Sequence, residues 1–273
     1  MSKIKILPEF RAMVWGNQEL NSIFNINSKE PIGEIWLLSG HHLYENKLDT
    51  GETVNEFGKK IYNGKYKRFP ILIKLVSTSK WLSVQVHPDD EFAQKIENEP
   101  WGKSEAWYFL TDGEFAICEN VDALEKLAKK NELEKLPEIL KFVKVKQGTF
   151  VNIPAGTVHA LGPNSTVIEV QQSSDLTYRI YDWGRPRETH LEKALKVSKN
   201  IKVDDIVFEN VTNLSSKYFT MEIFETKESF VNSSSSLSLP IIKIPTKIDK
   251  NFCASISYEK EFEQGQIYVY NFL

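Results

Sequence analysis

Cysteine is scarce in this chain. Cys118 and Cys253 are the only two among 273 residues, they lie far apart, and no CxxC pair occurs. The sequence therefore indicates neither a disulfide framework nor a zinc site built from thiolates. Nitrogen and oxygen ligands are left for any metal that the protein binds.

An excess of charge of one sign and long apolar runs are also missing. The 34 basic and 37 acidic residues give a net charge of −3, and no basic run is interleaved with aromatic residues, which argues against a nucleic-acid partner. No apolar segment has the length of a signal peptide or of a membrane span. We therefore expect a cytoplasmic protein without a membrane partner, and the sequence leaves the choice between monomer and homodimer open.

Short β-rich segments dominate the chain, and most are bounded by Gly, Pro, Asn or Asp, which is typical of a sandwich or barrel. They cover residues 35–38, 71–76, 82–86, 106–110, 150–153 and 166–171. Helical periodicity is confined chiefly to residues 90–97 and 122–140, where Asp122 is placed to cap the second helix. The pattern predicts a mainly β fold with a small helical insertion near 122–140.

The C-terminal part differs from the rest of the chain. A serine-rich patch at residues 232–236 is expected to be a surface loop or linker. We predict two domains: residues 1–216 form the larger one, and residues 217–273 form a second, abbreviated β unit.

Metal-ligating side chains occur on segments with the pattern of β-strands. Along residues 82–90, Ser83, Gln85 and His87 alternate with apolar residues and so point to one face of a strand. The spacing from Gly148 through a Pro/Gly turn to His159 describes a strand, a turn and a return strand on the same sheet. A lone strand histidine is more often a hydrogen-bonded structural residue, but imidazoles combined with a carboxylate suit zinc, or iron or manganese.

The Gly–Pro–Gly–His spacing that ends at His159 resembles the second motif of the cupin β-barrels. Much more of the chain resembles one cupin family, the type I mannose-6-phosphate isomerases (phosphomannose isomerases) in their short bacterial form. In that family's order, the matching segments are residues 15–16, 31–41, 69–74, 83–90, 102–108, 153–160 and 169–179. After about Ser216 little matches, so the closing cupin strands are expected to be shortened.

This resemblance implies a cupin (jelly-roll) barrel and an enzyme that interconverts mannose 6-phosphate and fructose 6-phosphate through an enediol-type proton transfer. It implies one Zn²⁺ per chain, with four ligands: Gln85, His87, Glu105 and His159. It also implies a pocket for a sugar phosphate that is formed by Lys74, Ser83, Lys103, Glu169, Asp175 and Arg179.

Each residue type suits a step of that reaction. A proton shuttle needs a group whose pKa is brought near working pH, and Glu169 is the first choice, with Lys103 the second. Arg179, Lys74 and the Ser83 hydroxyl are expected to hold the phosphate, although Arg179 has the alternative role of stabilising the enediolate.

Alternatives remain at the level of the sequence. Without the family context, Lys103 and Glu105 would be interpreted as a solvated charge pair, but Glu105 opens an aromatic strand, which favours a functional role. Arg185 and Arg187 lie in a stretch typical of an ion-paired loop, so neither arginine is assigned a role. A non-catalytic sugar-sensing relative and a cupin isomerase of another sugar phosphate are the two rival functions.

Overall fold

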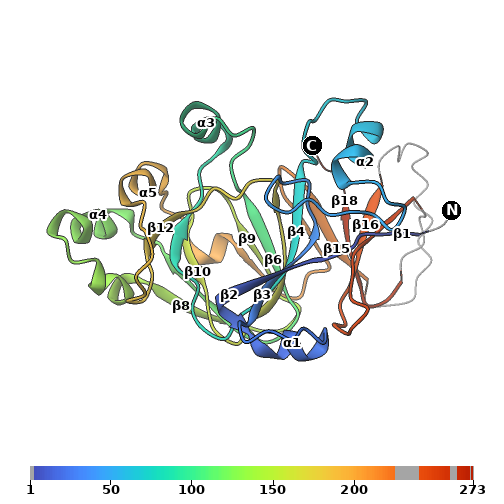
Figure 1. Cartoon of the computed structure of the whole chain (residues 1–273). Coiled ribbons are helices and arrows are strands. Elements are labelled where there is room, and N and C mark those ends of the chain that lie inside the picture. The colour runs from blue at the N-terminus through green and yellow to red at the C-terminus, as the bar shows by residue number, and fades with distance from the viewer. Residues whose placement is uncertain (1–2, 225–239, 259–262, 271, 273) are drawn as a thin grey trace.

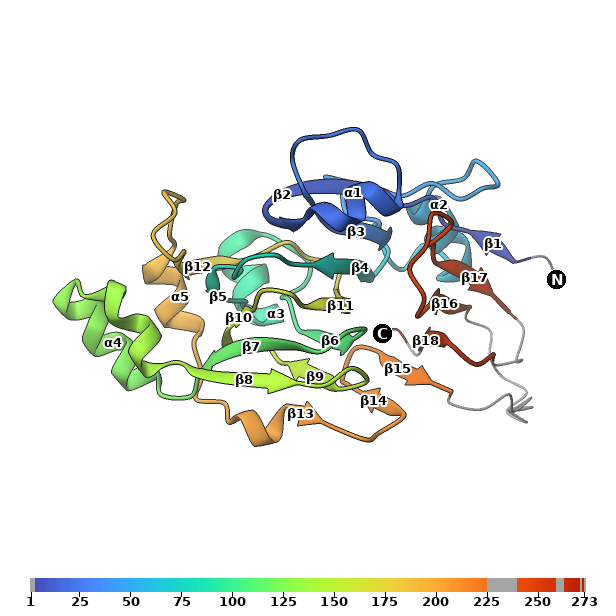
Figure 2. The ribbon, with the colours of Figure 1, turned by 90° about the horizontal axis from the view of Figure 1, so that it is seen from below.

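The computed structural model describes residues 3–224, 240–258, 263–270 and 272, so the serine-rich patch at 232–236 lies outside the described residues. Within these described residues the strands form three antiparallel sheets (Figure 1, Figure 2). The first contains, in order, β12 (Tyr178–Tyr181), β5 (Val84–Val86), β10 (Val158–Leu161), β7 (Gly113–Cys118) and β8 (Lys141–Val145). The second contains β13 (Val207–Phe208), β9 (Phe150–Ile153), β6 (Glu105–Phe109), β11 (Thr166–Gln172), β4 (Ile71–Ser77), β3 (Ile32–Leu38) and β2 (Glu9–Asn17).

The first two sheets face each other and enclose an apolar core. Trp107 and Val167 from the second sheet pack in one buried cluster with Phe115 and Ile117 from the first. The chain crosses repeatedly between the two sheets, so neighbouring strands are seldom consecutive in sequence. The prediction of a mainly β fold is confirmed, and the six β-rich segments predicted from the sequence all contain strands.

The third sheet covers the outer face of the second. It consists of β1 (Ile4–Lys5), β17 (Ser255–Ser257), β16 (Ile241–Pro245), β18 (Gln266–Tyr270), β15 (Thr220–Ile223) and β14 (Asn213–Ser215). Its Ile242 and Ile244 belong to the same buried cluster as Ile73 and Leu75 of β4. Strands β1 and β14 precede residue 217, so this sheet draws on both predicted domains, and the boundary at residue 216 stays a prediction.

Strand β4 is buried along its whole length because sheets lie on both of its faces. Alternate residues of a strand point to opposite faces, so Ile73 and Leu75 contact the third sheet, and the residue between them, Lys74, points the other way. A lysine directed into the barrel is costly to bury without partners. Its position therefore marks the inner face of β4 as part of a polar site.

Helices lie at the edges of these sheets (Figure 1). They are α1 (Gln18–Ile23), α2 (Val54–Ile61), α3 (Asp90–Phe92) with a following π-helical turn (Ala93–Glu97), α4 (Val121–Lys130), α5 (Leu191–Val197), and 3₁₀ turns at Leu133–Ile139 and Val203–Asp205. Helix α4 and the turn after it form the predicted insertion, between β7 and β8. The predicted cap at Asp122 is wrong: the N-cap is Asn120, two residues earlier, and its Oδ1 accepts from the Ala123 N–H at 3.0 Å.

Candidate active site

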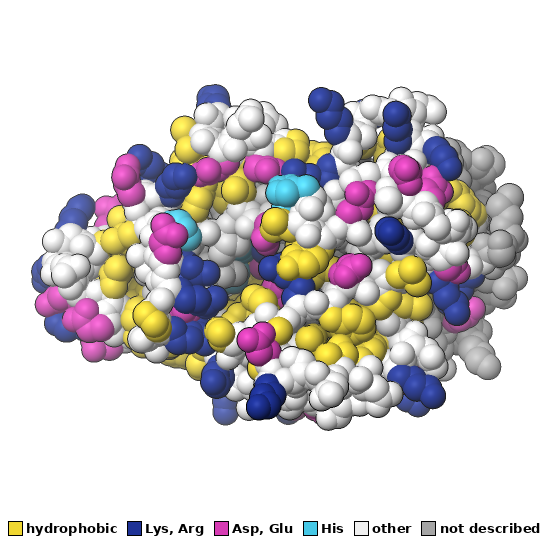
Figure 3. All heavy atoms as spheres, viewed as in Figure 1, with side chains coloured by type: hydrophobic (Ala, Val, Ile, Leu, Met, Phe, Trp, Pro, Cys, Tyr) yellow, Lys and Arg dark blue, Asp and Glu magenta, His cyan; other side chains and the backbone are white. Residues whose placement is uncertain are grey.

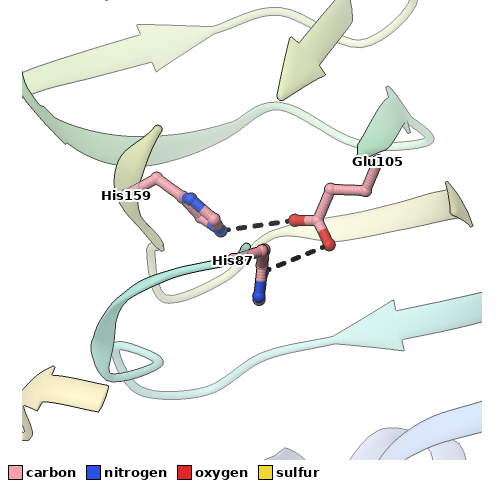
Figure 4. Close-up of side chains that lie close together, drawn as sticks. All are labelled: His87, Glu105 and His159. Atoms are coloured by element: carbon pink, nitrogen blue, oxygen red, sulfur yellow. Dashed lines mark ion pairs between the residues drawn. The ribbon is translucent and has the colours of Figure 1, made fainter. Parts of the chain in front are cut away.

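Three predicted metal ligands converge inside the barrel. His159 lies on β10, His87 follows the last residue of β5, and Glu105 begins β6. Each is about 1% exposed, and ligand atoms from the three side chains all lie within 4.8 Å of one another. In Figure 4 a dashed line joins each imidazole to a different oxygen of the Glu105 carboxylate. Residues from three strands thus form one compact group of donors.

Backbone carbonyls accept a hydrogen bond from one ring nitrogen of each imidazole. His87 Nδ1 lies 2.8 Å from Leu176 O, and His159 Nδ1 lies 2.9 Å from Thr157 O. A carbonyl oxygen only accepts, so each Nδ1 carries a proton and each Nε2 is directed away from the backbone toward Glu105. Burial and the Lys103 ammonium hold the pKa of His87 well below its usual value, which keeps this ring neutral.

The two Nε2 atoms face the carboxylate oxygens of Glu105. His87 Nε2 lies 3.5 Å from Oε2, and His159 Nε2 lies 3.3 Å from Oε1. Burial opposes ionisation of Glu105, but the Lys103 ammonium and the two histidines together outweigh it, so the pKa of this carboxyl is well below its usual range. The Lys103 ammonium lies between His87 Nε2 and Glu105 Oε2, whereas no cation of the described residues lies between His159 Nε2 and Glu105 Oε1.

Two of these buried atoms also lack a hydrogen-bond partner. Within the described part of the chain, neither Glu105 Oε1 nor His159 Nε2 makes a hydrogen bond. Leaving a buried polar atom unpaired costs about 1–3 kcal/mol. Two imidazoles and a carboxylate are a donor set that zinc prefers, so the residues present fit a zinc ion, and the orphaned atoms are the ones that it would satisfy.

Gln85 and Ser83 lie next to His87, Glu105 and His159, which are called the histidine group below. In the sheet, Gln85 is the cross-strand partner of His159 on one side and of Arg179 on the other. The Ser83 hydroxyl donates to Gln85 Oε1 at 3.1 Å. Gln85 therefore stands between the histidine group and Arg179, and its role as a fourth ligand stays a prediction.

A cavity of about 300 Å³ opens beside the group, and it brings together the predicted substrate-contacting residues. Its walls include all six residues of the predicted pocket, Lys74, Ser83, Lys103, Glu169, Asp175 and Arg179, and also Gln85, one of the predicted metal ligands. Figure 3 shows a hollow near the centre of this face, with dark blue Lys and Arg side chains gathered on its left side. The residues that the resemblance assigned to one pocket thus share one cavity.

Glu169 is the buried carboxylate of this cavity. It lies on β11, opposite Lys74 of β4 and Trp107 of β6. Trp107 Nε1 donates to Oε2 at 3.0 Å, and Lys74 Nζ lies 3.5 Å from Oε1. Burial and the nearby Glu105 charge raise the pKa of Glu169. This carboxylate is thus oriented by two donors and made more basic than a free glutamate.

Lys103 links the cavity to the histidine group. Its ammonium bonds Glu105 Oε2 and lies 3.2 Å from His87 Nε2. Both Lys103 and Glu105 are buried, at 4% and 1% exposure, so they are not a solvated charge pair.

Known proteins give the same fold and family. The model of the type I phosphomannose isomerase catalytic domain matches residues 4–118. The mannose-6-phosphate isomerase ManA of Bacillus subtilis is 36% identical over 207 residues, which are 70% of this chain and 66% of that protein. The mannose-6-phosphate isomerase of Streptococcus mutans is 31% identical over 225 residues, 78% of this chain and 70% of that protein. The chain belongs to the type I phosphomannose isomerases.

The solved structures agree with this assignment. The mannose 6-phosphate isomerase from Bacillus subtilis superimposes with a TM-score of 0.73 at 25% identity, and the match covers 98% of this chain and 93% of that one. The predictions of this family, of an isomerase of its class and of a cupin fold are therefore confirmed.

Among the helices that the structure describes, none has the length and apolar character needed to cross a bilayer.

The cavity also contains residues that were not predicted from the sequence. Glu34 accepts from Trp36 Nε1 at 2.8 Å and from Arg11 Nη1 at 3.2 Å, and it lies 3.9 Å from Lys74 Nζ. The sequence feature that could have identified Glu34 is its position as a single acidic residue in the apolar stretch 32–38. Arg11, Thr177 and Arg187 also line the cavity.

Proposed function

We propose that this chain is a zinc-dependent mannose-6-phosphate isomerase, which interconverts mannose 6-phosphate and fructose 6-phosphate. The observation that carries the proposal is the pair of orphaned donors, His159 Nε2 and Glu105 Oε1, beside a cavity that also holds the buried Glu169. A mannose 6-phosphate isomerase of the same fold, 16% identical with a TM-score of 0.70, has a structure described as bound with zinc and yttrium, which supports the choice of metal. A cytoplasmic location and the choice between monomer and homodimer stay predictions.

Four residues would hold one zinc ion per chain: His87, His159, Glu105 and the weaker donor Gln85. When bound, zinc supplies a Lewis acid that polarises the substrate's carbonyl or hydroxyl oxygen and stabilises the negative charge that develops there. The carbonyls of Leu176 and Thr157 fix the orientation of the two imidazoles through their Nδ1 protons.

Proton transfer between neighbouring carbons falls to Glu169. Its carboxylate lies in the cavity wall, its raised pKa favours proton acceptance near working pH, and Trp107 and Lys74 hold it in place. In the proposed reaction Glu169 accepts the proton from one carbon and returns it to the next. Lys103 is the second candidate, because it also lines the cavity beside the histidine group.

A coupled assay tests the whole proposal. Fructose 6-phosphate formed from mannose 6-phosphate is measured on the purified protein, after chelation, and after zinc is added back. We expect activity that chelation abolishes and zinc restores. No fructose 6-phosphate under any condition favours the sugar-sensing relative, and turnover of a different sugar phosphate favours the other rival. Activity that survives complete chelation contradicts zinc dependence.

Mannose 6-phosphate is expected to be a far better substrate than unphosphorylated mannose. The cations of the cavity make charge-assisted bonds to a phosphate, each worth about 1.5–3 kcal/mol, and binding energy at this remote group positions the reacting carbons. Losing two such bonds corresponds to at least about a hundredfold in kcat/KM. Steady-state kinetics on both sugars measure the ratio, and similar values would mean that these cations serve the fold.

A further inference from the structure

Charge is distributed unevenly along the wall of this cavity. At the end formed by β3, β4 and β11, the cations already have carboxylate partners. Lys74 lies 3.5 Å from Glu169 and 3.9 Å from Glu34, and Arg11 lies 3.2 Å from the same Glu34 oxygen. Lys103 is likewise paired with Glu105. Little positive charge is left at this end for an anionic ligand.

The opposite end, formed by β12 and the loop that follows it, has more cations than anions. Asp182 is 4% exposed and binds two guanidinium groups. Arg187 Nη2 donates to its Oδ1 at 2.8 Å while Arg187 Nε donates to Oδ2, and Arg185 Nη2 donates to Oδ1 at 2.6 Å. Such a two-point bond fixes the plane of a guanidinium. Arg187, which lines the cavity, is thus held in one orientation by a buried carboxylate.

Arg179 adds a third guanidinium to this end. Its Nη1 donates to the Glu188 carbonyl at 2.7 Å, and its buried Nε has no hydrogen-bond partner among the described residues. In the same part of the structure, no carboxylate forms an ion pair with it. Burial and the charge of Arg187 lower the pKa of Arg179, as expected for neighbouring like charges. Three guanidinium groups therefore lie at this end of the cavity, and the Asp182 carboxylate pairs with only two of them, Arg185 and Arg187.

We propose that Arg187 binds the substrate's phosphate group together with Arg179, and that Asp182 is the positioning residue that aims Arg187 at it. This inference rests on the proposed function and identifies the part of the same cavity that recognises the phosphate. A dianion supplies the negative charge that this end lacks, and planar guanidinium groups match phosphate oxygens in pairs. Lys74, which is already paired, then faces the sugar.

The dimensions of the sheet agree with this placement. Strand β12 is separated from β10, which carries His159, by β5 alone, and adjacent strands lie about 4.8 Å apart. Arg179 is therefore roughly 10 Å from the histidine strand, a span that a six-carbon sugar phosphate bridges. The phosphate at β12 leaves the reacting carbons beside Glu169 and the histidine group.

Substrate preference is the measurement that separates recognition from a structural role. In Arg187→Gln, the ratio of kcat/KM on mannose 6-phosphate to kcat/KM on mannose is expected to fall at least about tenfold, since one charge-assisted contact to the phosphate is lost. Asp182→Asn is expected to change the ratio in the same direction, and Arg187→Lys, which keeps the charge but loses the planar fork, to give an intermediate ratio. A purely structural role would lower both activities together and leave the ratio unchanged.

Lys196→Gln is the matched control, because it removes one exposed cation of helix α5 that bonds only Glu192 in the described structure. Its ratio is expected to equal that of the unmodified protein. The inference is overturned if the ratio of kcat/KM on mannose 6-phosphate to kcat/KM on mannose in Arg187→Gln stays within about twofold of that of the unmodified protein. If Arg187→Gln does not fold, the same criterion is applied to Arg187→Lys. If the unmodified protein does not isomerise mannose 6-phosphate, the proposed function fails, and calorimetric titration with inorganic phosphate still tests Arg187: unchanged affinity in Arg187→Gln overturns its role.

Discussion

His87→Ala and His159→Ala are each expected to lose the bound metal and to lower turnover by about a thousandfold or more. Each imidazole supplies one of few strong donors, and Lewis-acid stabilisation of developing charge is worth several kcal/mol. In either variant the remaining donors are too few to retain a divalent ion against a chelating wash. Elemental analysis after such a wash, combined with the coupled assay on the same sample, measures both effects.

An exposed histidine provides the control for this pair. His42 lies on the surface outside the cavity, so His42→Ala is expected to keep one metal ion per chain and full activity. Full metal content in His87→Ala or His159→Ala would remove that residue from the ligand set. No stoichiometric metal in the unmodified protein, prepared without chelator, would contradict the zinc site as a whole.

The histidine group was predictable because its signals are local. A period of two along residues 82–90 places Ser83, Gln85 and His87 on one face, and the Pro/Gly turn before His159 returns the chain along the same sheet. The structure has both features, with Gln85 and His159 as direct cross-strand partners. Alternation and turn chemistry depend on neighbouring residues, so one sequence was sufficient to identify them.

The residues that were missed depend on pairings between distant segments. Glu34 reaches Lys74 because β3 pairs with β4, with Trp36 opposite Lys74. The sequence around Glu34 contains no local pattern that predicts this register. Arg187 looked like part of an ion-paired loop, and it does pair with Asp182. That the same guanidinium also lines the cavity follows only from the position of β12 beside β5.

The third sheet illustrates the same limit. Strand β1, from the start of the chain, pairs with β17 near its end, with Ile4 opposite Ile256. A two-residue strand carries too little pattern to predict such a partner. The continuous burial of β4, in contrast, is indicated by its almost unbroken apolar sequence, because a strand that is covered on both faces has no solvent-exposed side.

Glu169→Gln is expected to keep its metal and to lower kcat by two to four orders of magnitude, the range for removal of a positioned acid or base. The amide has nearly the same shape as the carboxylate but accepts no proton from carbon. Trp107→Phe is the matched control: it removes the 3.0 Å bond to Glu169 Oε2 and leaves the carboxylate itself. It is expected to cost about tenfold or less, the worth of one hydrogen bond. Metal analysis and single-substrate kinetics on both variants measure these effects.

The pH profile identifies the base independently of the size of that loss. Burial and the Glu105 charge raise the pKa of Glu169, so the accepting, ionised form is lost on acidification at a higher pH than for a free glutamate. The unmodified protein should therefore show an acid limb in kcat/KM that reports this raised pKa, and the limb should be absent in Glu169→Gln. If Glu169→Gln instead retains the limb and loses less than about tenfold, while Lys103→Met abolishes activity with its metal in place, the proton is carried by Lys103 and the assignment of Glu169 is wrong.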